Sequence, residues 1–229
     1  MFKRLATTSA VIAAMGLSTT AHAFMIDDFS TGAQDSGFLI NAPQTYSDSV
    51  AGNPANMATG RRDMWYGQFE DPDENGGRTR ANVTGGGGQG VLSFSTGSQT
   101  RGNLVIDWDG DSAAPTGQTG TAPDIAPAVR NLGTGAAGFD LTDGGVSDAF
   151  YFDVISADLG FDFQIEVVDT GGNVALFDFP GQTPPINSPT TFGPVLFTSF
   201  NNFAATDFAS LRSLSLQIQP GGPERDFTI

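Results

Sequence analysis

Acidic residues with the spacing of a calcium loop are the first feature of this sequence that could do chemistry. Residues 71–76 read Asp-Pro-Asp-Glu-Asn-Gly and match D-x-D-x-N-G, the first half of a twelve-residue calcium loop. Carboxylates at alternate positions, followed by glycine, let a loop wrap around an ion that binds oxygen ligands. The twelfth position is Asn82, so the bidentate glutamate of an EF-hand is missing. The candidate calcium ligands are Asp71, Asp73 and Asn75, and the alternative interpretation is a solvated acidic turn.

A second acidic cluster lies at the end of an apolar segment. Asp107, Asp109 and Asp111 alternate with Trp108 and Gly110. Alternate side chains of an extended chain lie on one face, so these carboxylates would make a second, weaker candidate metal site. Mutual repulsion relieved by solvent explains the same pattern without a metal.

Composition excludes several classes of enzyme. The chain has no Cys, and its single His and single Lys, His22 and Lys3, lie in the first 23 residues. The remainder therefore cannot form a Ser-His-Asp or Cys-His nucleophile, a Schiff-base lysine or a zinc site built on His or Cys. A carboxylate pair of the glycosidase type is still available, with Glu166 as the best single acid. A solvated sheet face is the simpler interpretation of that residue.

Aromatic residues could instead bind sugars. Trp65, Tyr66 and Trp108 are three of only five Trp and Tyr residues, and planar rings stack well on sugar rings. Neighbours on a strand face opposite sides, so one of Trp65 and Tyr66 is expected in the core. The three rings are a weak candidate ligand-binding set.

Charge and the N-terminal sequence indicate the compartment. With 25 acidic and 10 basic residues the formal charge is −15, which repels phosphate backbones and argues against nucleic acid as a partner. Residues 1–23 combine a basic start, an apolar stretch and the small-x-small sequence Ala21-His22-Ala23, the pattern of a cleavable signal peptide. We therefore expect a secreted or cell-surface protein with no transmembrane segment in the mature chain.

Alternation of apolar and polar residues predicts β-strands through residues 24–229. In residues 161–168, Phe163, Ile165 and Val167 alternate with polar residues. Residues 211–218 show a similar alternation, with Leu214 in the apolar row. Many short strands separated by turn residues predict an all-β fold, a single antiparallel two-sheet β-sandwich of the jelly-roll kind. Residues 109–138 are rich in Gly, Ala, Pro and Thr and predict one long loop. A further strand is expected at 225–229.

Five short motifs carry a family resemblance. They are Ile-Asp-Asp-Phe at 26–29, Gly-Arg-Arg-Asp-Met at 60–64, and the segments 90–95, 104–110 and 224–229. Together they resemble the secreted β-sandwich domains of bacterial PEP-CTERM proteins, which are exosortase-processed surface and matrix proteins. The family's sorting tail is not found up to Ile229, so the sequence is either a secreted variant or one that stops where the sorting tail would begin.

The expected function is that of a secreted, non-catalytic structural or interaction protein of the extracellular matrix or cell surface. Its partners would be extracellular polysaccharide or other matrix proteins, and calcium is the only cofactor that the residues suggest. One alternative is a carbohydrate-binding module. The second alternative is a polysaccharide-active enzyme that uses carboxylates.

Overall fold

The computed structural model describes residues 26–37, 39–40, 44–52, 57–70, 78–84, 90–97, 100–110, 138–158, 161–179, 185–220 and 226–229, and the structural statements below concern these residues. The predicted signal segment 1–23 lies outside them. So does most of the predicted loop at 109–138.

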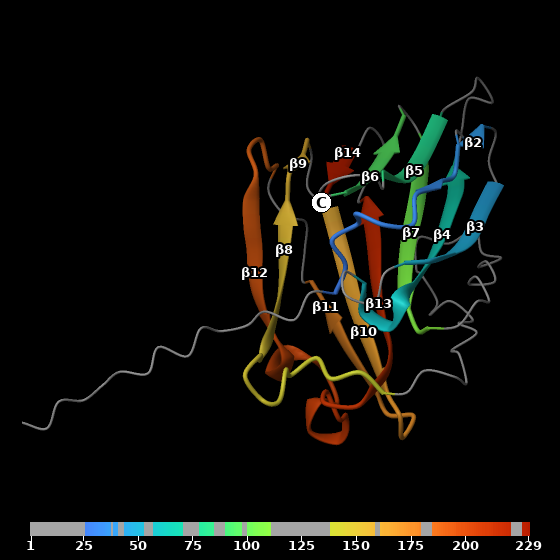
Figure 1. The fold of residues 1–229 in the computed structure, drawn as a ribbon. Helices are drawn as coiled ribbons and strands as arrows, with labels where there is room; N and C mark the ends of the chain where they lie inside the picture. The colour runs from blue at the N-terminus through green and yellow to red at the C-terminus, as the bar shows by residue number, and fades with distance from the viewer. Residues whose placement is uncertain are drawn as a thin grey trace, which may run out of the picture.

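One layer of the fold is a six-stranded antiparallel sheet (Figure 1). Its strands, in spatial order, are β11 (Val174–Asp178), β10 (Phe161–Asp169), β13 (Leu211–Pro220), β7 (Arg101–Trp108), β4 (Arg61–Glu70) and β3 (Gln44–Ala51). The four inner strands β10, β13, β7 and β4 each have a partner on both sides.

The second layer is built from two smaller antiparallel sheets. The larger runs β1 (Gln34–Asp35), β5 (Arg78–Thr84), β6 (Val91–Thr96), β14 (Asp226–Thr228) and β9 (Ser156–Ala157), with β2 (Leu39–Ile40) also paired to β5. The smaller pairs β12 (Thr190–Leu196) with β8 (Ala149–Val154). Because only Ile155 separates β8 from β9, the chain passes directly from one of these sheets into the other.

The core lies between the two layers, as the alternation predicts. Phe163, Ile165 and Val167 of β10 and Leu214 of β13 are buried in one apolar cluster with residues of the opposite layer. Ring contacts bridge the layers: Tyr66 of β4 meets Phe94 of β6 at 5.4 Å, and Phe152 of β8 meets Phe163 of β10 at 5.6 Å between centroids. The prediction of an all-β, antiparallel two-layer sandwich is confirmed.

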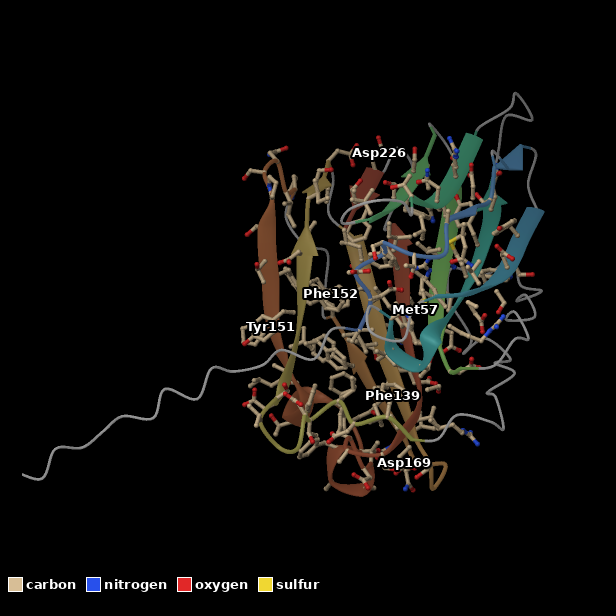
Figure 2. The ribbon with its side chains drawn as sticks, viewed as in Figure 1. Met57, Phe139, Tyr151, Phe152, Asp169 and Asp226 are labelled. Carbon is tan, nitrogen blue, oxygen red and sulfur yellow. The ribbon has the colours of Figure 1, made fainter. Side chains whose placement is uncertain are left out.

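The predicted strand near residue 229 is also present. β14 lies between β6 and β9, with Phe227 opposite Phe94 on one side and Ala157 on the other. Phe227 is buried, and Figure 2 places neighbouring Asp226 at the end of the molecule opposite Asp169. This segment therefore holds the second layer together.

Only three short 3-10 helices occur in the described part of the chain, 58–60, 197–199 and 203–205. None of the helices there is long and apolar enough to cross a membrane.

Candidate functional site

Four carboxyl side chains lie on the face of the six-stranded sheet that is turned away from the core, here called the carboxylate face. Asp63 of β4, Asp107 of β7 and Glu166 of β10 alternate with core residues, and Asp109 follows the last residue of β7 in the same alternation. The strand register places Asp63 opposite Asp107, Asp107 opposite Ser215, and Ser215 opposite Glu166. A single row across four strands thus carries three of the four acids.

These acids are buried although their face is not the apolar core. Asp63 is 1%, Asp107 3%, Asp109 2% and Glu166 9% exposed. The Ser215 hydroxyl donates a hydrogen bond to Asp107 Oδ1 at 3.3 Å. Withdrawing several carboxylates from water in one small region is costly unless protons or hydrogen-bond donors compensate them.

For Asp63, the cost of removing a carboxylate from water appears as a raised pKa. Burial raises the pKa of Asp63 to about 7, the Ser49 hydroxyl partly opposes the rise, and the Asp109 carboxylate adds to it. The Arg61 guanidinium also opposes the rise, and its Nη2 donates to Ser49 Oγ at 3.0 Å. Near neutral pH this carboxyl therefore exchanges a proton, the property required of a general acid.

Within the part of the chain that the structure describes, two polar side chains on the same face have no hydrogen-bond partner. The Ser213 hydroxyl and both polar atoms of the Gln217 amide are unpaired, and these residues are 0% and 1% exposed. Groups of this kind each cost about 1–3 kcal/mol when buried without a partner. Among the described residues, however, no three acidic, His or Cys side chains are grouped so that they could hold a metal ion.

The structure treats the predicted metal ligands differently. Asp107 and Asp109 lie on the same face, as their alternation predicted, and Asp63 and Glu166 join them from other strands. Asp111 lies outside the described residues. Asp71, Asp73 and Asn75 lie outside them as well, so calcium binding by that loop stays a prediction.

The three predicted sugar-stacking rings are all buried. Trp65 is 1%, Tyr66 0% and Trp108 3% exposed. Tyr66 points into the core, as expected for one of the two neighbours, but Trp65 is covered on the opposite face. None of the three presents a ring face to a sugar in this structure. Stacking on a sugar requires an exposed ring, and these side chains are buried on both faces of the sheet.

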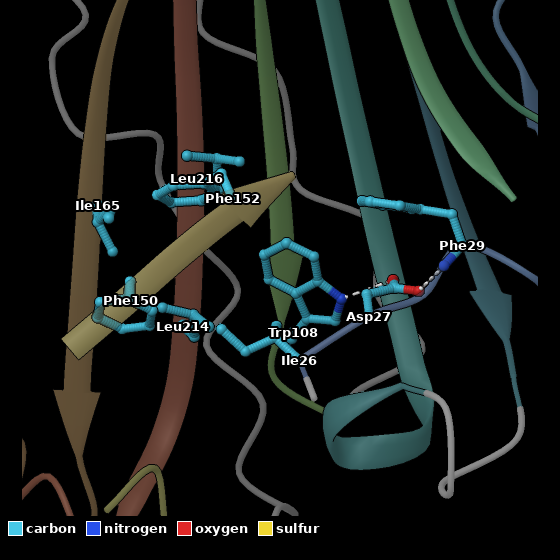
Figure 3. Close-up of a pocket in the computed structure, with 9 residues that line it drawn as sticks. All are labelled: Ile26, Asp27, Phe29, Trp108, Phe150, Phe152, Ile165, Leu214 and Leu216. Carbon is cyan, nitrogen blue, oxygen red and sulfur yellow. Dashed lines mark hydrogen bonds between the residues drawn. The ribbon is translucent and has the colours of Figure 1, made fainter. Parts of the chain in front are cut away.

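Trp108 instead lines a small apolar pocket of about 50 Å³ between the layers (Figure 3). Its indole Nε1 donates to Asp27 Oδ2 at 2.9 Å. The same carboxylate oxygen accepts a hydrogen bond at 2.7 Å from Arg62 Nη1, whose side chain is 0% exposed. The pocket is too small for a sugar ring, and its polar wall belongs to an internal ion pair.

This ion pair joins three segments that the sequence analysis treated separately. Arg62 Nε donates to Gln34 Oε1 at 2.8 Å, and its guanidinium carbon lies 5.3 Å from the centre of the Phe29 ring. Asp27, Arg62 and Trp108 come from three of the motifs that carry the family resemblance, and their contacts with one another are structural. The pairing connects residues 35 and 81 positions apart, so sequence spacing could not reveal it.

A larger hollow opens between the edge strands β11 and β12. The groove has a volume of about 360 Å³, within the size range of small-molecule sites. Its walls are mainly apolar and include Phe177, Phe179, Ile186, Phe192 and Val195. Alternation within one strand can assign these apolar side chains to a face of that strand. The groove itself depends on how β11 and β12, which are distant in the sequence, lie relative to one another.

An exposed aromatic side chain that the sequence did not single out is Tyr151 on β8. It is 58% exposed, and Figure 2 shows that it points away from the molecule whereas neighbouring Phe152 points inward. An alternating Tyr-Phe pair does not indicate which of the two faces solvent, because both residues are apolar enough for a core.

Comparison with protein-family models and with curated proteins finds no match for this chain.

Proposed function

We propose that this chain is an exported, non-catalytic protein that makes interactions at the cell surface or in the extracellular matrix. The export pattern in residues 1–23 and the resemblance to PEP-CTERM sandwich domains support this proposal. Extracellular polysaccharide or other matrix proteins would be its partners.

One observation carries the proposal: acid–base groups and contact surfaces lie in different places. The carboxyl groups of the carboxylate face are at most 9% exposed. The groove instead lies between β11 and β12, and the exposed Tyr151 lies on β8, the strand paired with β12. A general acid must lie within hydrogen-bond reach of the substrate atom that it protonates, so surfaces for contact are better developed than a site for catalysis.

A carboxylate-based polysaccharide hydrolase is the second candidate, and the raised pKa of Asp63 is the observation that favours it. A protonated acid beside the Asp109 carboxylate is the charge arrangement of a glycosidase pair. In that function Glu166, on the same row, would be the second acid to test.

The test has an export arm and a turnover arm. Full-length chain expressed in a bacterium should appear outside the cytoplasm, with a mass that corresponds to a chain beginning at Phe24. Purified chain incubated with extracellular matrix material should sediment with it and release no reducing ends. Retention in the cytoplasm contradicts the proposal. Release of oligosaccharides that disappears in both Asp63→Asn and Glu166→Gln establishes the enzyme instead.

A further inference from the structure

We propose that the outer face of the β8–β12 sheet binds a sugar ring of a neutral polysaccharide, with Tyr151 as the stacking platform. This inference rests on the proposed function as an extracellular interaction protein and names its partner class. The site consists of Tyr151 and Asp153 of β8 and Thr191 and Gly193 of β12, here called the Tyr151 face.

The Tyr151 ring can pack closely against β12 because the neighbouring residue there is a glycine, Gly193. A Cβ atom at Gly193 would lie 3.2 Å from Tyr151 Cδ1 and 2.8 Å from the Phe150 carbonyl oxygen, and the φ of this residue is +133°. A side chain at this position would therefore displace both the ring and the backbone. Because the ring packs against β12 yet stays 58% exposed, it is a platform formed before any ligand binds.

Hydrogen-bonding groups lie beside the ring on the same face. Asp153 follows Tyr151 by two positions and is paired with Thr191 across the strands. Thr191 Oγ1 donates to Asp153 Oδ1 at 2.8 Å. Within the described residues, Asp153 Oδ2 and the Tyr151 hydroxyl make no hydrogen bond, so both can meet sugar hydroxyls. An aromatic plane beside an acceptor and a donor suits a pyranose, which has an apolar face and a polar rim.

Charge selects the class of polysaccharide. Neither β8 nor β12 contains Lys or Arg, and Asp153 is the sole charged residue in the two strands. The whole chain has a formal charge of −15. An anionic polymer would be repelled by both charges, whereas a neutral one offers hydroxyl donors to the carboxylate.

A protein partner fits this face less well. Its exposed apolar side chains are Tyr151, Leu196 and Ile155, with 58%, 41% and 39% exposure. A large aromatic side chain contributes about 150–250 Å² when buried, and a stable interface buries about 800 Å² per partner. Three partly exposed side chains on a two-stranded sheet fall well short of that area.

Calorimetric titration with cellohexaose, mannohexaose and laminarihexaose tests the inference, with polygalacturonate as the anionic comparison. At least one neutral hexasaccharide should bind and polygalacturonate should not. Tyr151→Ala should weaken binding by about fivefold to tenfold, as expected for one lost stacking contact. Tyr151→Phe should retain most of the affinity. Val174→Ala, which shortens a 42% exposed side chain on β11, should leave the affinity for the sugar unchanged.

A second variant keeps the test independent of folding at position 151. Asp153→Ala removes the acceptor and should also weaken binding, while its melting temperature reports whether it folds. Binding to none of the neutral sugars overturns the inference, and so does equal affinity of Tyr151→Ala and the parent chain. Self-association at high concentration that Tyr151→Ala abolishes would assign the face to a second copy instead. Each of these results leaves export and matrix association, measured separately, to decide the proposed function.

Discussion

Replacing Asp63 with asparagine should stabilise the fold at alkaline pH and have little effect in acid. Asparagine resembles the protonated carboxyl in size and carries no charge, so it suits a position where burial and Asp109 oppose ionisation. The asparagine variant should therefore lack the pH-dependent penalty that the aspartate imposes on the folded state.

The size of the effect follows from the difference between folded and unfolded pKa values. In the fold the pKa of Asp63 is about 7, against an ordinary value of 3.8. Below about pH 4 the carboxyl is protonated in both states and imposes no penalty. As pH rises from about 4 to about 7, the unfolded chain loses this proton first, and the free energy of unfolding falls by about 1.4 kcal/mol per pH unit. Above about pH 7 the accumulated loss is about 4 kcal/mol.

The assay is urea denaturation of parent and variant at pH 4, 6 and 8. Other acids titrate in both chains, so the difference between their free energies of unfolding isolates Asp63. That difference should be below about 1 kcal/mol at pH 4 and reach roughly 3–4 kcal/mol at pH 8. Asp143→Asn removes the same charge from an exposed turn and controls for the change in net charge.

Two results would refute this reasoning. A difference that is the same at all three pH values would mean that Asp63 does not hold its proton more tightly when folded. A variant that is less stable than the parent at pH 8 would mean that the ionised carboxylate makes a favourable contact on the carboxylate face.

Three further predictions concern other parts of the chain. Asp27→Asn should lower the free energy of unfolding by about 3–5 kcal/mol because it leaves a buried guanidinium without its counter-charge, while Asp35→Asn, which breaks an exposed ion pair, should cost below about 1 kcal/mol in the same urea titration. Deleting residues 224–229 should lower the melting temperature markedly, because it removes β14 from between two strands, and an unchanged midpoint would contradict that role. Calcium at a hundredfold excess over its Kd should add about 2.7 kcal/mol and raise the melting temperature more than magnesium does. The double variant Asp71→Asn/Asp73→Asn should lose that response, and an equal response to both ions would indicate screening.

Alternation predicted most of the core positions of the central strands. In β10 and β13 the apolar row lies between the layers and the polar row lies on the other face, except that Leu211 is in the core cluster because the strand register shifts beside it. The period of two in a strand fixes this separation locally, so no knowledge of strand partners is needed.

The same rule could not predict how buried the other face is. Trp65 and Tyr66 were expected on opposite faces, and they are, but both are almost completely covered. Alternation assigns side chains to faces and leaves open whether a face meets solvent. One of Trp65 and Tyr66 was therefore wrongly expected to be exposed, and the exposed ring of Tyr151 was missed. Exposure depends on what the rest of the chain lays over each sheet, which is a non-local property.

Strand register explains why the carboxylate face was only half predicted. The spacing of Asp107 and Asp109 predicted that these two residues share one face at the end of a strand, and Asp109 directly follows β7. Asp63 joins them because β4 pairs with β7 in a register that sets it opposite Asp107, and a slip of one residue would turn it into the core. The composition of one strand cannot specify that register, although the perturbed pKa depends on it.

The charged residue in the core row of β4 follows from the same non-local pairing. Arg62 alternates with Met64 and Tyr66, positions that pack between the layers, and an arginine there would ordinarily argue against a buried strand face. Its burial is tolerable because Asp27 neutralises the charge, while Gln34 Oε1 and the carbonyl oxygens of Thr31 and Gly32 accept further hydrogen bonds from the guanidinium. Removing the Asp27 carboxylate therefore leaves the buried guanidinium without its counter-charge. The N-terminal segment of the described chain is thus held to the sandwich by an ion pair whose geometry specifies one position for it.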